Sequence, residues 1–199
     1  MTSTQLVPDV TSLHPLLTTR WSPTVFDASA SVDPSGVELL VEAARWAPSA
    51  GNSQPWGFIV GPRGSDEHAR LASHLAGSSS RWAPTAALLV ANLAHRYVEG
   101  TDWEYSEFAL YDLGQAVAHM TLQARSMGLY VRQFRAFDRD AIEADFAVPA
   151  HWEVCTMSAI GYLPPELAYG ADGRGIRTDR RPVTDLRWPE AAKDSRGGD

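Results

Sequence analysis

The chain lacks the features of several common classes of protein. Its 199 residues include a single cysteine, Cys155, so an internal disulfide is excluded and a reducing, cytoplasmic location is expected. No apolar run approaches the roughly 20 residues that span a bilayer, and residues 1–9 are too polar for a signal peptide. Because the net charge is −7, we expect neither a nucleic acid nor a membrane as a partner.

Several catalytic patterns are missing as well. The six histidines show no metal-ligand spacing, since no further Cys or His completes a set around His68 and His74. No G-x-G-x-x-G follows a strand, and the G-x-S-x-G elbow of hydrolases is absent. We therefore predict no metal site and no Rossmann domain. Cys155 lies in an apolar, strand-like run, which favours a buried, inert thiol over a nucleophile.

The composition is that of one globular domain, with 44% hydrophobic and 21% charged residues. We predict a single domain over 1–199, with its core at about 12–186 and a disordered tail at about 190–199. Hydrophobic periodicity predicts helices at 34–47, 66–75, 106–127 and 140–146, strands at 58–60, 86–93, 129–134 and 154–162, and a flexible surface loop at 77–80. Such a mixture indicates an α+β or α/β sandwich, while the pairing direction of the strands stays open.

The most informative segment lies between the first of these helices and the first strand. Small and amide side chains, Ser-Ala-Gly-Asn-Ser-Gln, lie between Pro48 and Pro55, with a tryptophan on either side. Amide groups and free backbone N–H groups can bind the polar edges of a planar heterocycle, and the prolines restrict the backbone. A polar connecting loop without a ligand is the competing interpretation, and spacing alone does not decide between the two.

Two further segments change that balance. One reads Thr19-Arg20-Trp21-Ser22-Pro23-Thr24-Val25-Phe26-Asp27, and the other reads Arg177-Thr178-Asp179-Arg180-Arg181-Pro182-Val183. In this order, the three segments resemble the nitroreductase family of FMN-dependent oxidoreductases. Its motifs read roughly Arg-x-Ser-x-Arg-x-Phe, then Ser-Pro-Ser-x-x-Asn-x-Gln-Pro-Trp, then a late Arg/Lys-Pro. The resemblance covers about residues 15–186. It implies a central mixed β-sheet flanked by helices, in an intertwined homodimer whose C-terminal segments reach across to the partner.

The resemblance implies a site for the FMN phosphate, whose charge needs compensation when buried. The residues at the matching positions are Arg20, Trp21, Ser22, Thr24, Arg180 and Arg181. Thr24 departs from the family pattern, which commonly has a second basic residue there, and Thr178 similarly replaces a lysine of some relatives. Either FMN binds more weakly here, or Arg181 supplies the missing charge. The alternative is that these arginines are solvated surface residues.

The resemblance also implies which residues contact the flavin ring, and they lie in other segments of the chain. The residues at the matching positions are Pro48, Ser49, Ala50, Gly51, Asn52, Gln54, Arg135 and Ala136. In the family the first of these segments often comes from the partner subunit. Ala136 stands where relatives usually have glycine, and its backbone N–H would bond flavin N5. Arg135 either faces the pyrimidine edge of the flavin or is a surface cation.

A short segment before the longest helix occupies the place of the family's substrate lid. Trp103 and Tyr105 in this segment offer aromatic faces to a flat substrate, or pack in a dimer interface.

The resemblance therefore implies an FMN-dependent oxidoreductase that transfers hydride from NAD(P)H through flavin N5 to an electron-poor small molecule, such as a nitroaromatic or a quinone. The choice between NAD and NADP is open, and no side chain is assigned as an obligatory acid or base. One alternative is a non-catalytic FMN-binding or storage protein, motivated by Thr24 and Ala136. Another is an enzyme of the same fold with a different reaction, such as dehalogenation or ring oxidation.

Overall fold

The computed structural model describes residues 13–168 and 179–188. The predicted tail at 190–199 and Thr178 lie outside the described residues. The elements, in chain order, are α1 (Pro15–Thr18), α2 (Pro34–Arg45), η2 (Ala50–Asn52), β1 (Trp56–Pro62), α3 (Asp66–Ser73), η3 (Ala83–Thr85), β2 (Leu88–His95), α4 (Ala109–Ser126), β3 (Tyr130–Phe134), α5 (Arg139–Asp145), β4 (Trp152–Gly161), α6 (Pro165–Ala168) and η5 (Val183–Leu186). Among the helices described, none is long and apolar enough to cross a membrane.

The strands form one sheet in the order β1-β2-β4-β3. Each neighbouring pair is antiparallel, with Val60 opposite Val90 and Val90 opposite Ser158. β2 is almost entirely buried, which explains its long apolar run, and β4 is buried throughout its second half. The α+β sandwich is confirmed. The described strands contain no parallel pair, so the mixed sheet that the resemblance implied is antiparallel in this part of the chain.

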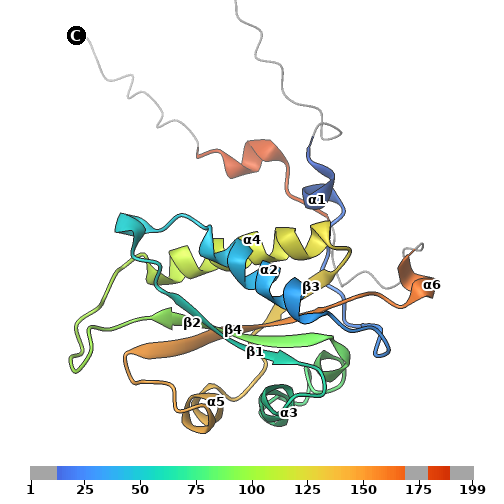
Figure 1. Cartoon of the computed structure of the whole chain (residues 1–199). Helices are drawn as coiled ribbons and strands as arrows, with labels where there is room; N and C mark the ends of the chain where they lie inside the picture. The colour runs from blue at the N-terminus through green and yellow to red at the C-terminus, as the bar shows by residue number, and fades with distance from the viewer. Residues whose placement is uncertain (1–12, 169–178, 189–199) are drawn as a thin grey trace, which may run out of the picture.

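Helices cover both faces of the sheet (Figure 1). α2 and α4 pack on one face, where Leu40, Met120 and Ile160 are buried. α3 and α5 pack on the other, where Leu71 and Met157 are buried. Successive residues of a strand point to opposite faces, so each central strand serves both cores. Burying one such side chain contributes about 1.5–3 kcal/mol, and these two apolar layers hold the fold together.

The two long helices have recognisable ends. α2 begins after Asp33, whose carboxylate accepts a hydrogen bond from the Gly36 N–H at 2.7 Å, with Pro34 at the first helical position. It ends at Arg45, two residues before the expected end, ahead of Pro48. α4 begins at Ala109, three residues later than predicted, and Gly128 follows its end with a φ of 81°.

The turn at 77–80 differs from the prediction of a flexible surface loop. Ser79 is buried, and its hydroxyl donates hydrogen bonds to the carbonyls of Ala76, at 3.0 Å, and of Ala136. The prediction is therefore wrong for Ser79, because this small polar side chain ties the turn to the segment after β3. Three flanking residues, 77, 78 and 80, are exposed as expected.

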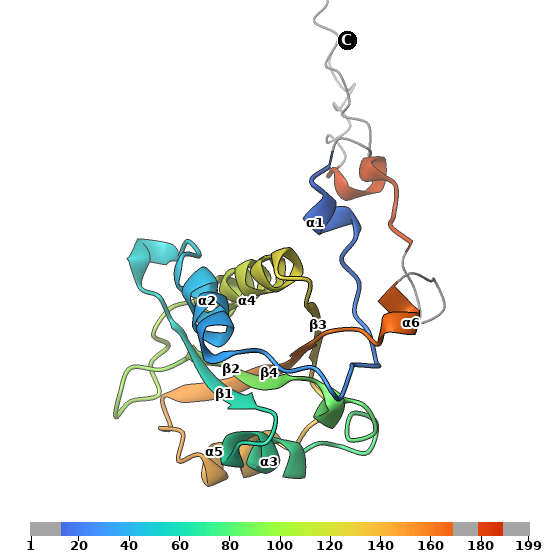
Figure 2. The ribbon, with the colours of Figure 1, turned by 45° about the vertical axis from the view of Figure 1, so that its right-hand side comes forward.

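Segments from the two ends of the chain project from the sandwich. α1 and η5 lie beside each other, away from the sheet, in both views (Figure 2). Neither helix contains a buried residue. Their apolar side chains, including Leu17, Val183 and Leu186, are exposed, so this part of the surface offers apolar area to another molecule.

Cys155 lies on β4 and is partly buried, and burial raises the pKa of its thiol to about 11. Since the thiolate is the reactive form, we predict that alkylation by iodoacetamide at pH 8 is about a hundredfold slower in the native than in the urea-unfolded protein. The measurement is the rate of mass increase in each state. Native and unfolded rates within threefold of each other would contradict this account of the thiol.

Candidate functional site

The loop after α2 has an unusual backbone. Gly51, Asn52 and Gln54 have positive φ angles of 58°, 56° and 48°. Left-handed conformations are uncommon for residues other than glycine, and each costs about 1–3 kcal/mol unless the surroundings impose it. Two such side chains in one loop therefore indicate a conformation that the rest of the fold maintains. These residues are among those that the sequence implies for the flavin ring.

A buried carboxylate holds this loop. Asp112, in the first turn of α4, is 2% exposed, and its Oδ2 accepts a hydrogen bond from the Ala50 N–H at 3.0 Å. Gln115 Nε2 donates to Asp112 Oδ1 at 3.3 Å and to the Pro48 carbonyl at 3.4 Å. Within the loop, Ser49 Oγ accepts from the Gln54 N–H at 3.0 Å. The loop is thus fixed to the start of α4.

Sequence reasoning missed Asp112 and Gln115. A signal was present, because Asp112 lies directly before Leu113 in a helix whose neighbouring residues are largely apolar or small. An acidic residue on a buried helical face is rare unless it is paired. The periodicity of α4 identified its apolar stripe but could not show what the acid bonds.

A second part of the site lies farther along α4. A pocket of about 310 Å³ is lined by Leu17, Arg20, Ser22, Ala118, Thr121, Leu122, Val131 and Gln133. Arg20 Nη1 donates to Ser22 Oγ at 3.4 Å, and Gln133 Nε2 donates to Thr121 Oγ1 at 3.4 Å. The pocket combines a cation, hydroxyls and an amide with an apolar wall, which suits an anionic ligand with an organic body.

The structure keeps these two parts of the site apart within one chain. Asp112 anchors the loop and Thr121 lines the pocket, nine residues farther along α4. At 1.5 Å per residue the two lie about 14 Å apart along the helix axis. Trp21 does not line the pocket but packs edge-on against Tyr130, with ring centroids 5.6 Å apart. Thr24 is not among the described residues that line it either.

The segment after β3 is held by its neighbours. The Arg135 guanidinium lies over the Phe137 ring, 4.5 Å from its centroid, and donates to the Phe137 carbonyl at 3.0 Å. The Ala136 carbonyl accepts from the Ala76 N–H at 3.0 Å and from Ser79. The Arg135 side chain is exposed and contacts Phe137 of the same segment. This placement favours neither a role at the pyrimidine edge of the flavin nor that of a surface cation.

The late arginines of the sequence motif lie elsewhere. Arg180 and Arg181 are exposed and precede η5, and neither is among the described residues that line the pocket of Arg20. The structure thus brings Arg20 and Ser22 together, whereas Arg180 and Arg181 precede η5 on the segment that projects from the sandwich.

Trp103 and Tyr105 belong to a hairpin-like extension of β2. The Val98 N–H donates to the Trp103 carbonyl at 2.8 Å, and the Trp103 side chain is 73% exposed. The Tyr105 ring stacks on His95 with centroids 3.9 Å apart, so one of its faces is covered by its own chain. Burial is the main cause that lowers the pKa of His95, which favours a neutral ring in this stack. The extension lies near the loop, because the His95 N–H donates to the Pro55 carbonyl at 3.0 Å.

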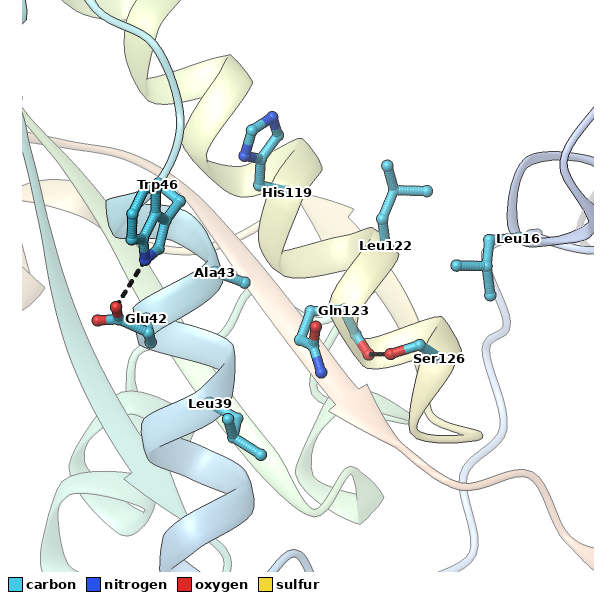
Figure 3. A pocket seen from close by; sticks show the side chains of 9 residues that line it. All are labelled: Leu16, Leu39, Glu42, Ala43, Trp46, His119, Leu122, Gln123 and Ser126. Atoms are coloured by element: carbon cyan, nitrogen blue, oxygen red, sulfur yellow. Dashed lines mark hydrogen bonds between the residues drawn. The ribbon is translucent and has the colours of Figure 1, made fainter.

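A larger groove of about 490 Å³ runs between α2 and α4 (Figure 3). Its lining residues are Leu16, Leu39, Glu42, Ala43, Trp46, His119, Leu122, Gln123 and Ser126. Trp46 donates from its indole N–H to Glu42 at 2.7 Å, yet its side chain stays 72% exposed. The groove contains none of the residues that the sequence implies for the cofactor. It is an open apolar surface next to the loop.

Comparison with known proteins places these features in a family. The sequence model of the nitroreductase family matches residues 17–88. An uncharacterised 15.4 kDa protein of Mycolicibacterium smegmatis is 32% identical over 148 residues, which are 71% of this chain and 97% of that protein. A Streptomyces coelicolor protein with the provisional name NADH dehydrogenase/NAD(P)H nitroreductase is 24% identical over 153 residues, covering 68% and 75% of the two chains. A crystal structure described as an oxidoreductase containing FMN has a TM-score of 0.79 at 25% identity, covering 96% and 98%.

The bond between Asp112 and the Ala50 N–H gives a prediction. Asp112→Leu removes the acceptor and leaves the half-buried Ala50 N–H unpaired, which costs about 1 kcal/mol in the free energy of unfolding. We expect faster amide hydrogen exchange at residues 50–54, measured by mass spectrometry. Asp112→Asn keeps an acceptor oxygen and is the matched control, with exchange close to wild type. Equal exchange in all three proteins would show that the loop does not depend on this side chain.

Proposed function

We propose that this chain, which belongs to the nitroreductase family, is an FMN-dependent oxidoreductase. The observation that carries the proposal is the left-handed loop at 50–54, held by a buried carboxylate at the position of the family's flavin-binding motif. Backbone conformations of this kind cluster at ligand-binding and active sites. The FMN in a similar solved oxidoreductase and the provisional name of the Streptomyces relative support the same reaction class.

The residues present fit FMN. The pocket of Arg20 offers a guanidinium and the Ser22 hydroxyl to a phosphate, and apolar Leu122 and Val131 to the rest of the ligand. Asn52 and Gln54 are exposed and can donate to the polar edge of a ring. A bound FMN would supply the redox chemistry, namely hydride transfer from NAD(P)H and reduction of an electron-poor acceptor such as a nitroaromatic or a quinone. The chain binds and orients the reactants, and solvent supplies the protons.

A homodimer completes this site. In one chain the residue that anchors the loop, Asp112, and a residue that lines the pocket, Thr121, lie about 14 Å apart along the axis of α4. A second copy in two-fold symmetry can bring its loop to the pocket of the first. The groove of Figure 3 leaves two large apolar side chains exposed: Trp46, next to the loop, and Leu39, farther back along α2. Apolar area of this kind is typical of surfaces that a partner covers.

The cofactor proposal predicts a yellow protein. The purified protein is expected to show flavin absorption in the visible range, and to bleach when NADH or NADPH is added without oxygen. Oxygen should restore the colour. A bound flavin that stays oxidised would favour the non-catalytic binding protein instead. A colourless protein that does not take up added FMN would contradict both.

If the pocket and the loop of each site come from different subunits, two inactive variants should complement each other in a heterodimer. Arg20→Gln removes the charge of the pocket. Gly51→Val damages the loop because valine disfavours the φ of 58° at this position. A steric clash is not the cause, since a Cβ at residue 51 would meet no atom within 4 Å. Each homodimer should lose most of its NAD(P)H-dependent activity. A heterodimer of the two, purified through two different tags, contains one undamaged site and should recover about half of the wild-type activity.

The matched control carries both substitutions in one chain, paired with a wild-type chain. If pocket and loop come from different subunits, this heterodimer has no undamaged site and is inactive. If each chain builds its own site, the outcomes reverse, and only the control heterodimer is active. That reversal, or a monomeric active protein, would overturn the shared site.

A further inference from the structure

Three guanidinium groups converge on the four residues 19–22. Arg20 Nη1 lies 3.4 Å from Ser22 Oγ. Arg125 Nη2 comes from the last turn of α4 and lies 3.5 Å from Thr19 Oγ1. Arg132 Nη1 comes from β3 and donates to the Ser22 carbonyl at 2.9 Å. The segment that lines the pocket is therefore surrounded by positive charge from three parts of the fold.

These three arginines lack the partners that other arginines of this acidic chain have. Arg45, Arg70, Arg96 and Arg139 each have a carboxylate within 4.0 Å. Within residues 13–168 and 179–188, no carboxylate lies that close to Arg20, Arg125 or Arg132. The Nε–H groups of Arg125 and Arg132 are buried and donate to no partner in the described part of the chain. A cluster of like charges without counter-charge is unfavourable until an anion joins it.

Aromatic rings hold two of these cations in place. The Arg125 guanidinium lies over the Tyr130 ring at 3.9 Å, and that of Arg132 lies 5.3 Å from the Trp82 ring centroid. Such stacking fixes a guanidinium without neutralising its charge. The charges are thus positioned before any ligand arrives, which lowers the cost of binding an anion.

We propose that Arg132, aided by Arg125, supplies the positive charge that Thr24 does not, and so makes the pocket of Arg20 and Ser22 selective for a phosphate monoester. The proposal rests on the function proposed above, in which that phosphate is the end of FMN. Arg132 lies on β3 between Val131 and Gln133, which line the pocket, so its side chain leaves the strand on the opposite face. It acts through the Ser22 carbonyl, which it orients, and through its charge. It is a positioning residue rather than a direct ligand.

The test compares two flavins that differ only in the phosphate. Flavin-stripped, full-length protein is titrated with FMN and with riboflavin, and each dissociation constant is read from the quenching of flavin fluorescence. Arg132→Gln should weaken FMN binding about five- to tenfold and leave riboflavin binding unchanged, because only the phosphate responds to the lost charge. Arg132→Lys should restore most of the preference for FMN. Raising the salt concentration should weaken FMN binding less in Arg132→Gln than in wild type.

Arg70→Gln is the matched control. Arg70 also stacks on an aromatic ring, 4.0 Å from the Phe146 centroid, but it belongs to α3 and bonds Asp145. Its loss should change stability and leave the ratio of the two dissociation constants unchanged. If Arg132→Gln weakens both flavins equally, or neither, Arg132 is a structural residue and the proposal is wrong. A wild-type protein that binds neither flavin overturns the proposed function itself, and the role of Arg132 with it.

Discussion

The packing of α4 across β2 and β4 is the constraint on which the remaining arrangement depends. Leu113, Val117 and Met120 fix the helix to the sheet from one side, and the helix presents its two ends to different parts of the site. Asp112 at one end holds the loop, and Thr121 nearer the other end lines the pocket. Because the apolar contact fixes the rotation of the helix about its axis, both side chains point where the site requires them.

The charge around the pocket is opposite in sign to the net charge of the chain. The net charge is −7, yet the pocket is surrounded by guanidinium groups without a described carboxylate partner. Elsewhere, as at Arg70 and Asp145, cations are paired across elements. An acidic surface repels anions at long range, so a phosphate has to be recognised locally. In the proposal above, Arg20 and Ser22 bind it, and Arg125 and Arg132, which stack on aromatic rings, add positive charge.

Much of the fold follows from the sequence, because apolar periodicity reports burial directly. The stripe of α4 and the continuous apolar run of β2 identified these elements to within a few residues. The pairing direction of the strands could not be predicted, since residues such as Val90 are apolar in either arrangement. Ser79 was placed on the surface because a serine-rich turn gives no sign that one hydroxyl lies within hydrogen-bonding distance of the carbonyls of Ala76 and Ala136.

The candidate site was predictable where the residues lie close together in the chain. Arg20 and Ser22 share a pocket, in agreement with the family resemblance, which implied that both lie at one site. The supports of the site were not predictable, since Asp112 is 62 residues from Ala50 and Arg132 is 110 residues from Ser22. The separation of the loop from the pocket could not be predicted either. It depends on the positions along α4 of Asp112, which bonds the loop, and of Thr121, which lines the pocket.

The spacing of Asp112 and Thr121 along α4 restricts where residues can be inserted or deleted in this chain. One residue inserted between Asp112 and Thr121 turns one end of α4 by about 100° relative to the other and removes one of the two side chains from its place. The extension that carries Trp103 has no such limit, since its exposed tip can lengthen without disturbing β2. Among natural variants of this fold, insertions and deletions should therefore accumulate around the extension and be excluded from the middle of α4.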